Sequence, residues 1–393
     1  MTPATAAALD GLRIHLDRLG FSQIYKYLVS AGQYAATPTL ITRTTAPQVD
    51  KFFDQFPRRG KELALVRCLL TGRGFALATL SELDRALAER LVDAGLLVAE
   101  GSEIVAGHWQ LISAFGLDLL IDRRIHFGGN IHEVYIGPDS YWMLYYIDAV
   151  NIRRADRVLD LCTGSGIAAL YLSLFSDHVL ATDIGEMPLA LVEMNRRLNG
   201  RDSAVTIRRE DLRQTLRGEE RFDLLTCNPP FVAFPPGYAG QLYAQGTDPD
   251  GLGYLRDIAA TLPRLLNPSG SAYLVADLVG DKNQPHYSTE LEALAATHAM
   301  RIDAYIDNTL PAAAQLEPMI AFLKRGKALA DDSQIRADLL AFQQHTLRAE
   351  RYYLTTLRLR PGAALPGLKV WRRDLIGEQP RREKPWPALL HQH

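Results

Sequence analysis

Residues 158–170 have the sequence VLDLCTGSGIAAL, and this stretch decides the fold of the chain. An apolar run of strand-forming residues leads into a glycine-rich turn, which leads into an apolar helical stretch. Gly164 and Gly166 lack a Cβ atom, so the backbone can turn sharply and approach a ligand closely. The helix that follows presents free N–H groups in its first turn. The segment predicts a site for a cofactor that contains a nucleoside, a device that dinucleotide sites also use.

Short strand-forming runs alternate with helical stretches from residue 157 onward. The runs are RVLDLC (157–162), HVLATDI (178–184), AVTIRRED (204–211), FDLLTC (222–227) and SAYLVADLV (271–279). Alternation at this spacing is typical of right-handed βαβ units, in which a mostly parallel sheet is covered by helices on both faces. The expected fold class is therefore α/β. A helical stretch follows residue 326, and RYYLTTLRLRP (351–361) is expected to supply the last strand.

Acidic side chains end three of these runs. Asp183 ends the second, where its carboxylate can accept both hydroxyls of a ribose, and Asp211 ends the third, where it can accept an adenine amino group. Asp160, at the end of the first, is expected to contact a methionine group directly or through water. Ile184 and Leu212 follow two of these acids and are expected to contact the cofactor as well. NAD enzymes also place an acid after the second strand, but acids at three successive strand ends favour S-adenosylmethionine (SAM).

The fourth strand leads into the motif NPPF at 228–231. Two consecutive prolines remove two N–H donors and fix an extended backbone, so carbonyl groups can point rigidly into a site. A side-chain amide, backbone carbonyls and an aromatic face then meet near the cofactor, an arrangement that suits a planar amine or amide nitrogen. The expected catalytic residues are Asn228, Pro229, Pro230 and Phe231, and Asn228 is expected to contact the cofactor too.

Taken together, DLCTGSG, TDIGEMPLALVEMNRRLN, NPPF and QGTDPDGLGYLRDI resemble the methyltransferases that carry an N-P-P-Tyr or N-P-P-Phe motif. The likeness is strongest to enzymes that modify glutamine nitrogen in peptide-release factors and ribosomal proteins, and it covers roughly residues 130–325. The resemblance implies a Rossmann-like class I methyltransferase fold with a mostly parallel seven-stranded sheet and SAM as the cofactor.

By the same resemblance, Thr163, Gly164 and Gly166 line the methionine pocket, and residues 228–231 serve the acceptor. The sequence departs from the family pattern at Cys162, where glycine is usual. It departs again at Phe231, which replaces the commoner tyrosine and so lacks its hydroxyl.

The segment EVYIGPDSYWMLYYIDAV (133–150) has too many aromatic residues for a passive linker. It is either a core helix that packs on the sheet or a wall of the active site, and it can be both. The residues expected to bind the substrate come from this segment and from the region after the fourth strand: Tyr135, Asp139, Ser140, Tyr141, Phe231 and Tyr238.

Residues 1–125 are expected to form a smaller, mainly helical domain, and residues 126–393 the catalytic domain with a helical insertion and a C-terminal arm. The clearest N-terminal helix is expected to start after Thr79, with Leu83, Leu87 and Leu91 on one apolar stripe. The alternating stretch that follows, near 96–112, suggests a two-stranded wing, so this domain resembles a winged-helix module.

The formal net charge is −2, from 43 basic and 45 acidic residues, so no global positive field attracts nucleic acid. The chain has no signal-peptide pattern and no long apolar run, so a cytoplasmic location without membrane contact is expected. Its 3 cysteines are far apart, and no metal is expected.

Three functions remain open from the sequence. The first is methyl transfer from SAM to a nitrogen, or less favourably an oxygen, of a small molecule or peptide side chain. The second is attack at the γ-carbon of SAM, by its own amino group or an external nucleophile, with release of methylthioadenosine. The third uses nucleic acid, as a base-methylating enzyme or as a DNA-binding regulator that responds to SAM.

Overall fold

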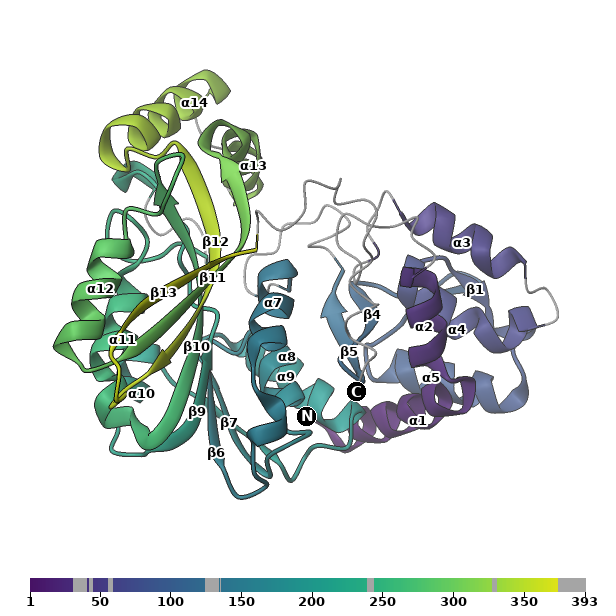
Figure 1. Cartoon of the computed structure of the whole chain (residues 1–393). Helices are drawn as coiled ribbons and strands as arrows, with labels where there is room; N and C mark the ends of the chain where they lie inside the picture. Colours follow the sequence, from purple (N-terminus) through teal and green to yellow (C-terminus); the bar gives the residue numbers. More distant parts are fainter. Residues whose placement is uncertain are drawn as a thin grey trace.

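The computed structural model describes residues 1–30, 41, 45–55, 59–123, 134, 136–238, 244–326 and 331–373. In Figure 1 a large sheet with helices on both sides forms one part of the molecule, and a smaller, mainly helical part lies beside it. The N-terminal residues belong to the smaller part. None of the helices in the described residues is long and apolar enough to cross a membrane.

The large sheet contains eight strands in the order β13-β11-β12-β10-β9-β6-β7-β8. The strands are β6 (Arg157–Leu161), β7 (His178–Asp183), β8 (Val205–Arg209), β9 (Phe222–Cys227), β10 (Leu266–Gly280), β11 (Arg301–Pro311), β12 (Arg351–Arg360) and β13 (Gly367–Arg372). The five strands β8, β7, β6, β9 and β10 are mutually parallel, and β12 runs antiparallel between β10 and β11. The expected α/β fold and its seven strands are confirmed, and β13 adds an eighth at the edge beside β11.

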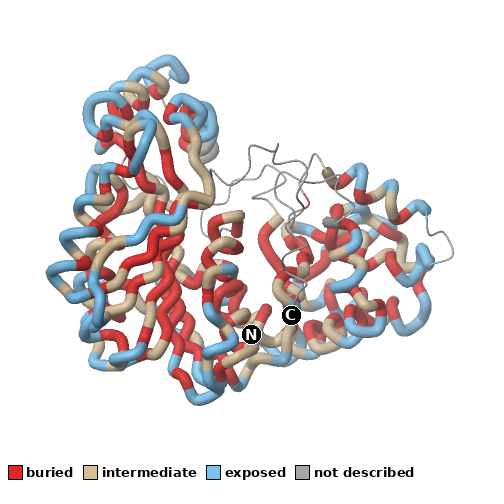
Figure 2. The backbone as a smooth tube through the Cα atoms, viewed as in Figure 1, coloured by how far each residue is buried: buried red, intermediate tan, exposed pale blue. Residues whose placement is uncertain are grey.

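Helices cover both faces of this sheet (Figure 1). One face carries α7 (Pro138–Tyr146), α8 (Ile167–Leu172) and α9 (Glu186–Leu198); the other carries α10 (Leu212–Arg217), α11 (Gly253–Leu265) and α12 (Ser288–Thr297). In β6, Val158 packs in the core on the face of α7, α8 and α9, whereas Leu159 and Leu161 pack in the core on the face of α10, α11 and α12. All three are fully buried. The near-continuous apolar character of the central strands follows from this double burial, which Figure 2 shows along the strands.

The N-terminal part contains α1 (Pro3–Leu19), α2 (Phe21–Ser30), α3 (Ala46–Asp54), α4 (Gly60–Thr71) and α5 (Glu82–Asp93). A three-stranded sheet of order β1-β3-β2 joins them, made of β1 (Phe75–Ala76), β2 (Val98–Glu100) and β3 (Glu103–Val105). The expected helix followed by a two-stranded hairpin is present as α5, β2 and β3. The assignment to the winged-helix class and the domain boundary at residue 125 remain predictions.

Two details of α5 differ from the sequence expectation. Its N-cap is Ser81, whose hydroxyl accepts the N–H of Asp84, whereas the Thr79 hydroxyl donates to the carbonyl of Ala76. Leu83 is 62% exposed, so the buried stripe consists of Leu87 and Leu91. The sequence offers two hydroxyl residues near this helix start, and Ser81 is the one that caps it. The helix therefore begins at Glu82, two residues later than predicted.

A second hairpin, β4 (Trp109–Ala114) and β5 (Leu117–Asp122), joins the two parts of the molecule. The open edge of β5 meets Asn195 of α9 and Asn199, the C-cap residue of this helix. The amide of Asn195 binds the N–H and the carbonyl of Leu120 at 2.8 and 2.9 Å, and Asn199 binds Asp118 in the same way at 3.0 and 2.7 Å. The helix therefore replaces a strand partner at this edge.

A helical insertion separates β11 from β12 and consists of α13 (Ala312–Gly326) and α14 (Asp332–Ala341), followed by a short π-helical turn (Phe342–Thr346). Figure 1 places α13 and α14 beyond one end of the sheet. The strand expected at 351–361 is β12. The expected C-terminal arm lies outside the described residues.

Candidate functional site

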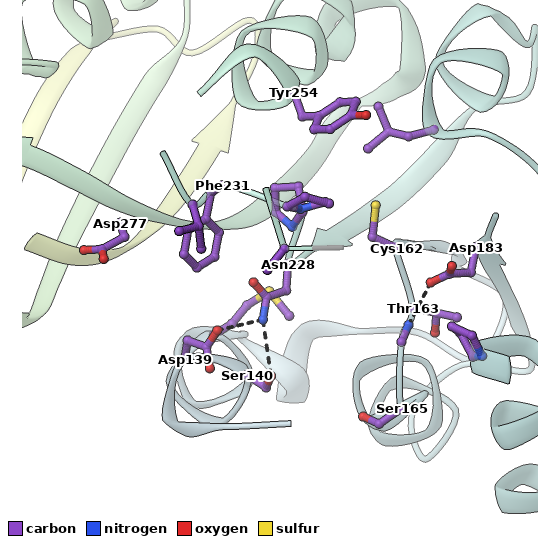
Figure 3. Close-up of a pocket in the computed structure, with 18 of the residues that line it drawn as sticks. Asp139, Ser140, Cys162, Thr163, Ser165, Asp183, Asn228, Phe231, Tyr254 and Asp277 are labelled. Atoms are coloured by element: carbon purple, nitrogen blue, oxygen red, sulfur yellow. Dashed lines mark hydrogen bonds between the residues drawn. The ribbon is translucent and has the colours of Figure 1, made fainter. Parts of the chain in front are cut away.

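A cavity of about 710 Å³ lies where β6, β7 and β9 end, the edge at which open α/β sheets bind ligands. Its lining comes from the loops after these strands, from α7 and from the insertion. Most of the predicted site residues line it: Asp139, Ser140, Asp160, Thr163, Gly164, Asp183, Ile184, Asp211, Leu212, Asn228, Pro229, Pro230 and Phe231. Figure 3 shows several of these side chains around the cavity.

The glycine-rich turn after β6 has three residues with positive φ: Cys162 (52°), Gly164 (51°) and Gly166 (79°). A Cβ atom on Gly166 would lie 2.8 Å from Cγ2 of Val192, so this glycine lets the turn pack closely against α9. Gly164 lines the cavity, whereas Gly166 faces α9 and does not line it. The two glycines predicted to serve the cofactor therefore have different roles.

Asp183 is fixed by backbone donors on both sides. Its Oδ2 accepts the N–H of Gly164 at 3.1 Å, and its Oδ1 accepts the N–H of Gly185 at 2.9 Å. The side chain is partly exposed and lines the cavity. Each carboxylate oxygen retains lone-pair capacity, so the pair of oxygens can accept two neighbouring hydroxyl groups from a ligand.

Asp160 is 2% exposed and binds three donors within the protein. Its carboxylate accepts the hydroxyls of Thr163 and Thr226 at 2.6 and 2.7 Å and the N–H of Ala169 at 3.2 Å. Burial nonetheless raises its pKa to about 6, against the opposite effect of these hydrogen bonds. Asp160 therefore ties the glycine-rich turn to β9 and to the start of α8.

The predicted adenine end of the cavity is formed at the start of α10. Asp211 is the N-cap of this helix, and its carboxylate accepts the N–H of Arg213 at 2.8 Å. Tyr254 of α11 also lines this cavity, and the guanidinium of Arg213 lies 5.2 Å from its ring centre. The motif QGTDPDGLGYLRDI contains Tyr254, but its pattern alone does not indicate which of its residues reaches the cavity.

Asn228 is oriented by α7. Its Nδ2 donates to Oδ2 of Asp139 at 3.0 Å and to Oγ of Ser140 at 3.3 Å, as the dashed lines in Figure 3 show. Both N–H groups of the amide are therefore directed at the helix. Oδ1 is the remaining polar atom of this side chain, and it is an acceptor. Two residues expected to bind substrate thus hold the side chain expected to be catalytic.

Three predicted residues do not line the cavity, and a fourth lies outside the described residues. Tyr141 is 4% exposed and stacks on Phe115 at 5.6 Å between ring centres, because it faces away from Asp139 on α7. The hydroxyl of Tyr238 donates to Asp338 of α14 at 2.9 Å. Gly166 faces α9, as described above. Tyr135 falls outside the described residues.

Several lining residues were not singled out from the sequence. They are Met143 of α7, Tyr254 of α11, Asp277 of β10, Gln315 and Met319 of α13, and Tyr352 of β12. Burial, and next the nearby charge of Asp139, raise the pKa of Asp277 to about 7. A signal existed for Asp277, because it is the one acidic residue in the apolar run SAYLVADLV. The residues of α13 come from more than 80 positions after NPPF, which no local pattern connects to the site.

A family model for the methyltransferase small domain matches residues 143–236. The chain is 37% identical over 170 residues to a protein of Bradyrhizobium diazoefficiens named ribosomal protein uL3 glutamine methyltransferase. This match covers 39% of this chain and 51% of that protein. It is 30% identical over 197 residues to a protein of Bordetella pertussis named release factor glutamine methyltransferase. This match covers 48% of this chain and 66% of that protein. The chain thus spans between half and two thirds of these relatives.

Among solved structures, an SAM-dependent methyltransferase from Agrobacterium tumefaciens is similar at 14% identity with a TM-score of 0.39. The match covers 65% of this chain and 71% of that one. The family match includes the end of α7 from Met143, the glycine-rich turn, Asp183 and NPPF, which line much of the cavity. Residues 143–236 of this chain therefore match the methyltransferase small domain and lie within a Rossmann-like sheet, and S-adenosylmethionine is the cofactor that such a match implies.

Proposed function

We propose that this chain is an SAM-dependent enzyme that methylates a nitrogen of a peptide side chain or a small molecule. The observation that carries the proposal is the fixed orientation of Asn228. Its amide N–H groups are directed at Asp139 and Ser140, so its Oδ1 can accept a hydrogen bond from an N–H group. This oxygen can bind a substrate group that carries hydrogen, and an amine or amide N–H is such a group.

The residues of the cavity suit SAM. The volume of about 710 Å³ lies within the usual range for small-molecule sites. Asp183 offers two oriented carboxylate oxygens for ribose hydroxyls, Asp211 and Leu212 lie at the predicted adenine end, and Thr163 and Gly164 line the turn between β6 and α8. When bound, SAM supplies an electrophilic methyl group on a sulfonium centre.

The residues of NPPF would position the acceptor. Asn228 Oδ1 would accept an acceptor N–H, which draws electron density toward nitrogen, and the ring of Phe231 would support the acceptor from one side. Pro229 and Pro230 have no N–H groups and restrict the backbone, so the segment holds its shape. Positioning of this kind can supply a large part of the rate, because methyl transfer needs an in-line approach at roughly 3–3.5 Å.

The names of the curated relatives support a protein substrate. Those proteins are named for glutamine methylation in a ribosomal protein and in a release factor. A peptide side chain is therefore the first acceptor class to test for this chain, with small-molecule nitrogen compounds as the second.

The test is a product analysis by mass spectrometry. The protein is incubated with SAM and with short peptides that contain glutamine, lysine or histidine, or with small amines. The expected products are S-adenosylhomocysteine and an acceptor heavier by one methyl group. Methylthioadenosine as the main nucleoside product would contradict the proposal, because it would show attack at the γ-carbon of SAM.

A further inference from the structure

The cavity is strongly acidic. Its described lining residues include six acids, Asp139, Asp160, Asp183, Glu210, Asp211 and Asp277, and no lysine, arginine or histidine. The acids at the cofactor end are already used: Asp160 and Asp183 accept the hydrogen bonds given above, Asp211 caps α10, and Glu210 accepts the hydroxyl of Thr215 at 2.8 Å. Asp139 accepts an amide N–H of Asn228. Of the six acids, Asp277 alone has no hydrogen-bond partner among the described residues.

Asp277 lies at the far end of the cavity from Asp183. Figure 3 shows the two residues on opposite sides, with Phe231 and Asn228 between them. A ribose held by Asp183 is therefore separated from Asp277 by the residues of the NPPF motif. Asp277 belongs to the acceptor side.

The charge of Asp277 has no partner in the described part of the chain. None of the described residues donates a hydrogen bond to its carboxyl group. The nearby negative charge of Asp139 repels the charged form of Asp277. Burial and this repulsion raise its pKa to about 7. Asp277 is only partly buried, but a carboxylate in this environment without a partner charge is costly, and a bound cation would offset that cost.

The surroundings of Asp277 suit a cation that carries apolar groups. Phe231, Met143 and Met319 line the same cavity, as does Tyr352, whose pKa is raised first by burial and further by the charge of Asp277. An aromatic face attracts cations, and Asn228 Oδ1 adds a further acceptor. A neutral carboxamide would leave the charge of Asp277 uncompensated.

We propose that the acceptor is a protonated amine, held between Asp139 and Asp277 beside Phe231, and that Asp277 takes its proton. The proposal rests on the proposed methyl transfer to nitrogen and narrows it to a class other than the glutamine carboxamide named for the curated relatives. The ammonium group loses one proton to the carboxylate of Asp277, which frees the nitrogen lone pair. That pair forms the bond to the methyl carbon, the carbon–sulfur bond breaks, and its electrons remain on sulfur. Asp277 then releases the proton to solvent.

The test compares two probes of similar size, phenethylamine hydrochloride and the neutral 3-phenylpropanamide. Their binding to the protein saturated with S-adenosylhomocysteine is measured by calorimetry at pH 8, where Asp277 is mostly charged. The amine should bind roughly tenfold or more tightly than the amide, the usual gain from a charged hydrogen bond. Asp277→Asn should abolish this preference while SAM affinity stays unchanged. Glu292→Gln, which removes a charge from an exposed position of α12, should retain the preference.

Equal binding of the two probes, weak binding of both, or a preference that survives in Asp277→Asn would each overturn the inference. The proposed function fails in a different way. If phenethylamine binds through Asp277 but no amine or peptide receives a methyl group from SAM, the subsite stands and methyl transfer is wrong. If a glutamine peptide is methylated equally by the wild type and by Asp277→Asn, methyl transfer stands and the amine class is wrong.

Discussion

Asp160 and Asp277 have raised pKa values, about 6 and about 7, but the two residues differ in what surrounds them. Asp160 has three hydrogen-bond donors and serves the architecture of the glycine-rich turn. Asp277 has no donor among the described residues and faces the cavity. A raised pKa marks burial in both cases, and the presence or absence of donors separates a structural carboxyl from one available to a ligand.

The stability of the protein should therefore depend on pH through Asp277. Its folded-state pKa lies above the unfolded value, so the folded state binds more protons between about pH 4 and pH 7, and stability from this group falls as pH rises through that window. Asp277→Asn stays neutral and should be more stable than the wild type at pH 8, by about 1–2 kcal/mol after solvent screening. At pH 4 the difference should nearly vanish. Urea unfolding at the two pH values checks this, and a larger gain at pH 4 would refute it.

Asn228 gives the second prediction at this scale. Asn228→Ala removes the Oδ1 acceptor and leaves Asp139 and Ser140 without this partner, so turnover with any acceptor that the wild type methylates should fall by about ten- to hundredfold. SAM affinity should fall much less, because Asp183 and the glycine-rich turn remain. Steady-state kinetics and SAM calorimetry give the two values. Equal losses in both would assign Asn228 to cofactor binding instead.

The sequence predicts site residues well where a short motif fixes the backbone. Asp183 is the last residue of β7 and Asn228 directly follows β9, so the parallel sheet brings them to one edge whatever the distant contacts are. Cys162 has φ of 52°, a conformation that favours glycine, the residue that the family resemblance leads us to expect there. Tyr141 could not be separated from Asp139 by proximity in sequence alone, because the side of α7 that faces the cavity depends on packing against Phe115.

At the scale of elements, α9 connects the small part of the molecule to the glycine-rich turn after β6. Asn195 is fully buried, binds Leu120 of β5, and also donates to the carbonyl of Ser165 in the turn at 3.3 Å. Asn199, one helical turn later, binds Asp118 but is partly exposed. The two residues form a matched pair in which burial is the main difference.

Asn195→Leu should cost about 2–4 kcal/mol of unfolding free energy, because it leaves buried backbone groups of Leu120 without partners. Asn199→Leu is the control and should cost only about 0.5–1.5 kcal/mol, because water can reach the groups of Asp118. Denaturant unfolding of both variants provides the comparison. Equal costs would contradict the inference that burial makes the contacts of Asn195 the more important ones.

The elements themselves were largely predictable, and the exceptions have physical causes. The central strands are buried on both faces, so their apolar runs are clear. None of the residues of the edge strand β13 is buried, so its sequence has no apolar run that would indicate a strand. The contact between α9 and β5 depends on side-chain amides that bind backbone groups some 75 residues away, which no periodicity records.

At the scale of the whole molecule, charge argues against a nucleic acid substrate. The net charge is −2, and the described lining of the cavity carries six acids and no base. Phosphate groups would be repelled from this cavity. Fluorescence anisotropy with transfer RNA and with duplex DNA should show no tight binding at about 150 mM salt. Tight binding with a steep salt dependence would favour the nucleic-acid function instead.

The most direct test of the account is a calorimetric titration of SAM into the wild type and into Asp183→Ala. The wild type should bind one SAM per chain, and Asp183→Ala should bind it more weakly by about 1–3 kcal/mol, or roughly five- to 150-fold, because a charged hydrogen-bond partner is lost. A circular-dichroism melting curve of the variant verifies that it remains folded. Absence of SAM binding to the wild type, or equal affinity in a folded Asp183→Ala, would contradict the assignment of this cavity to the cofactor.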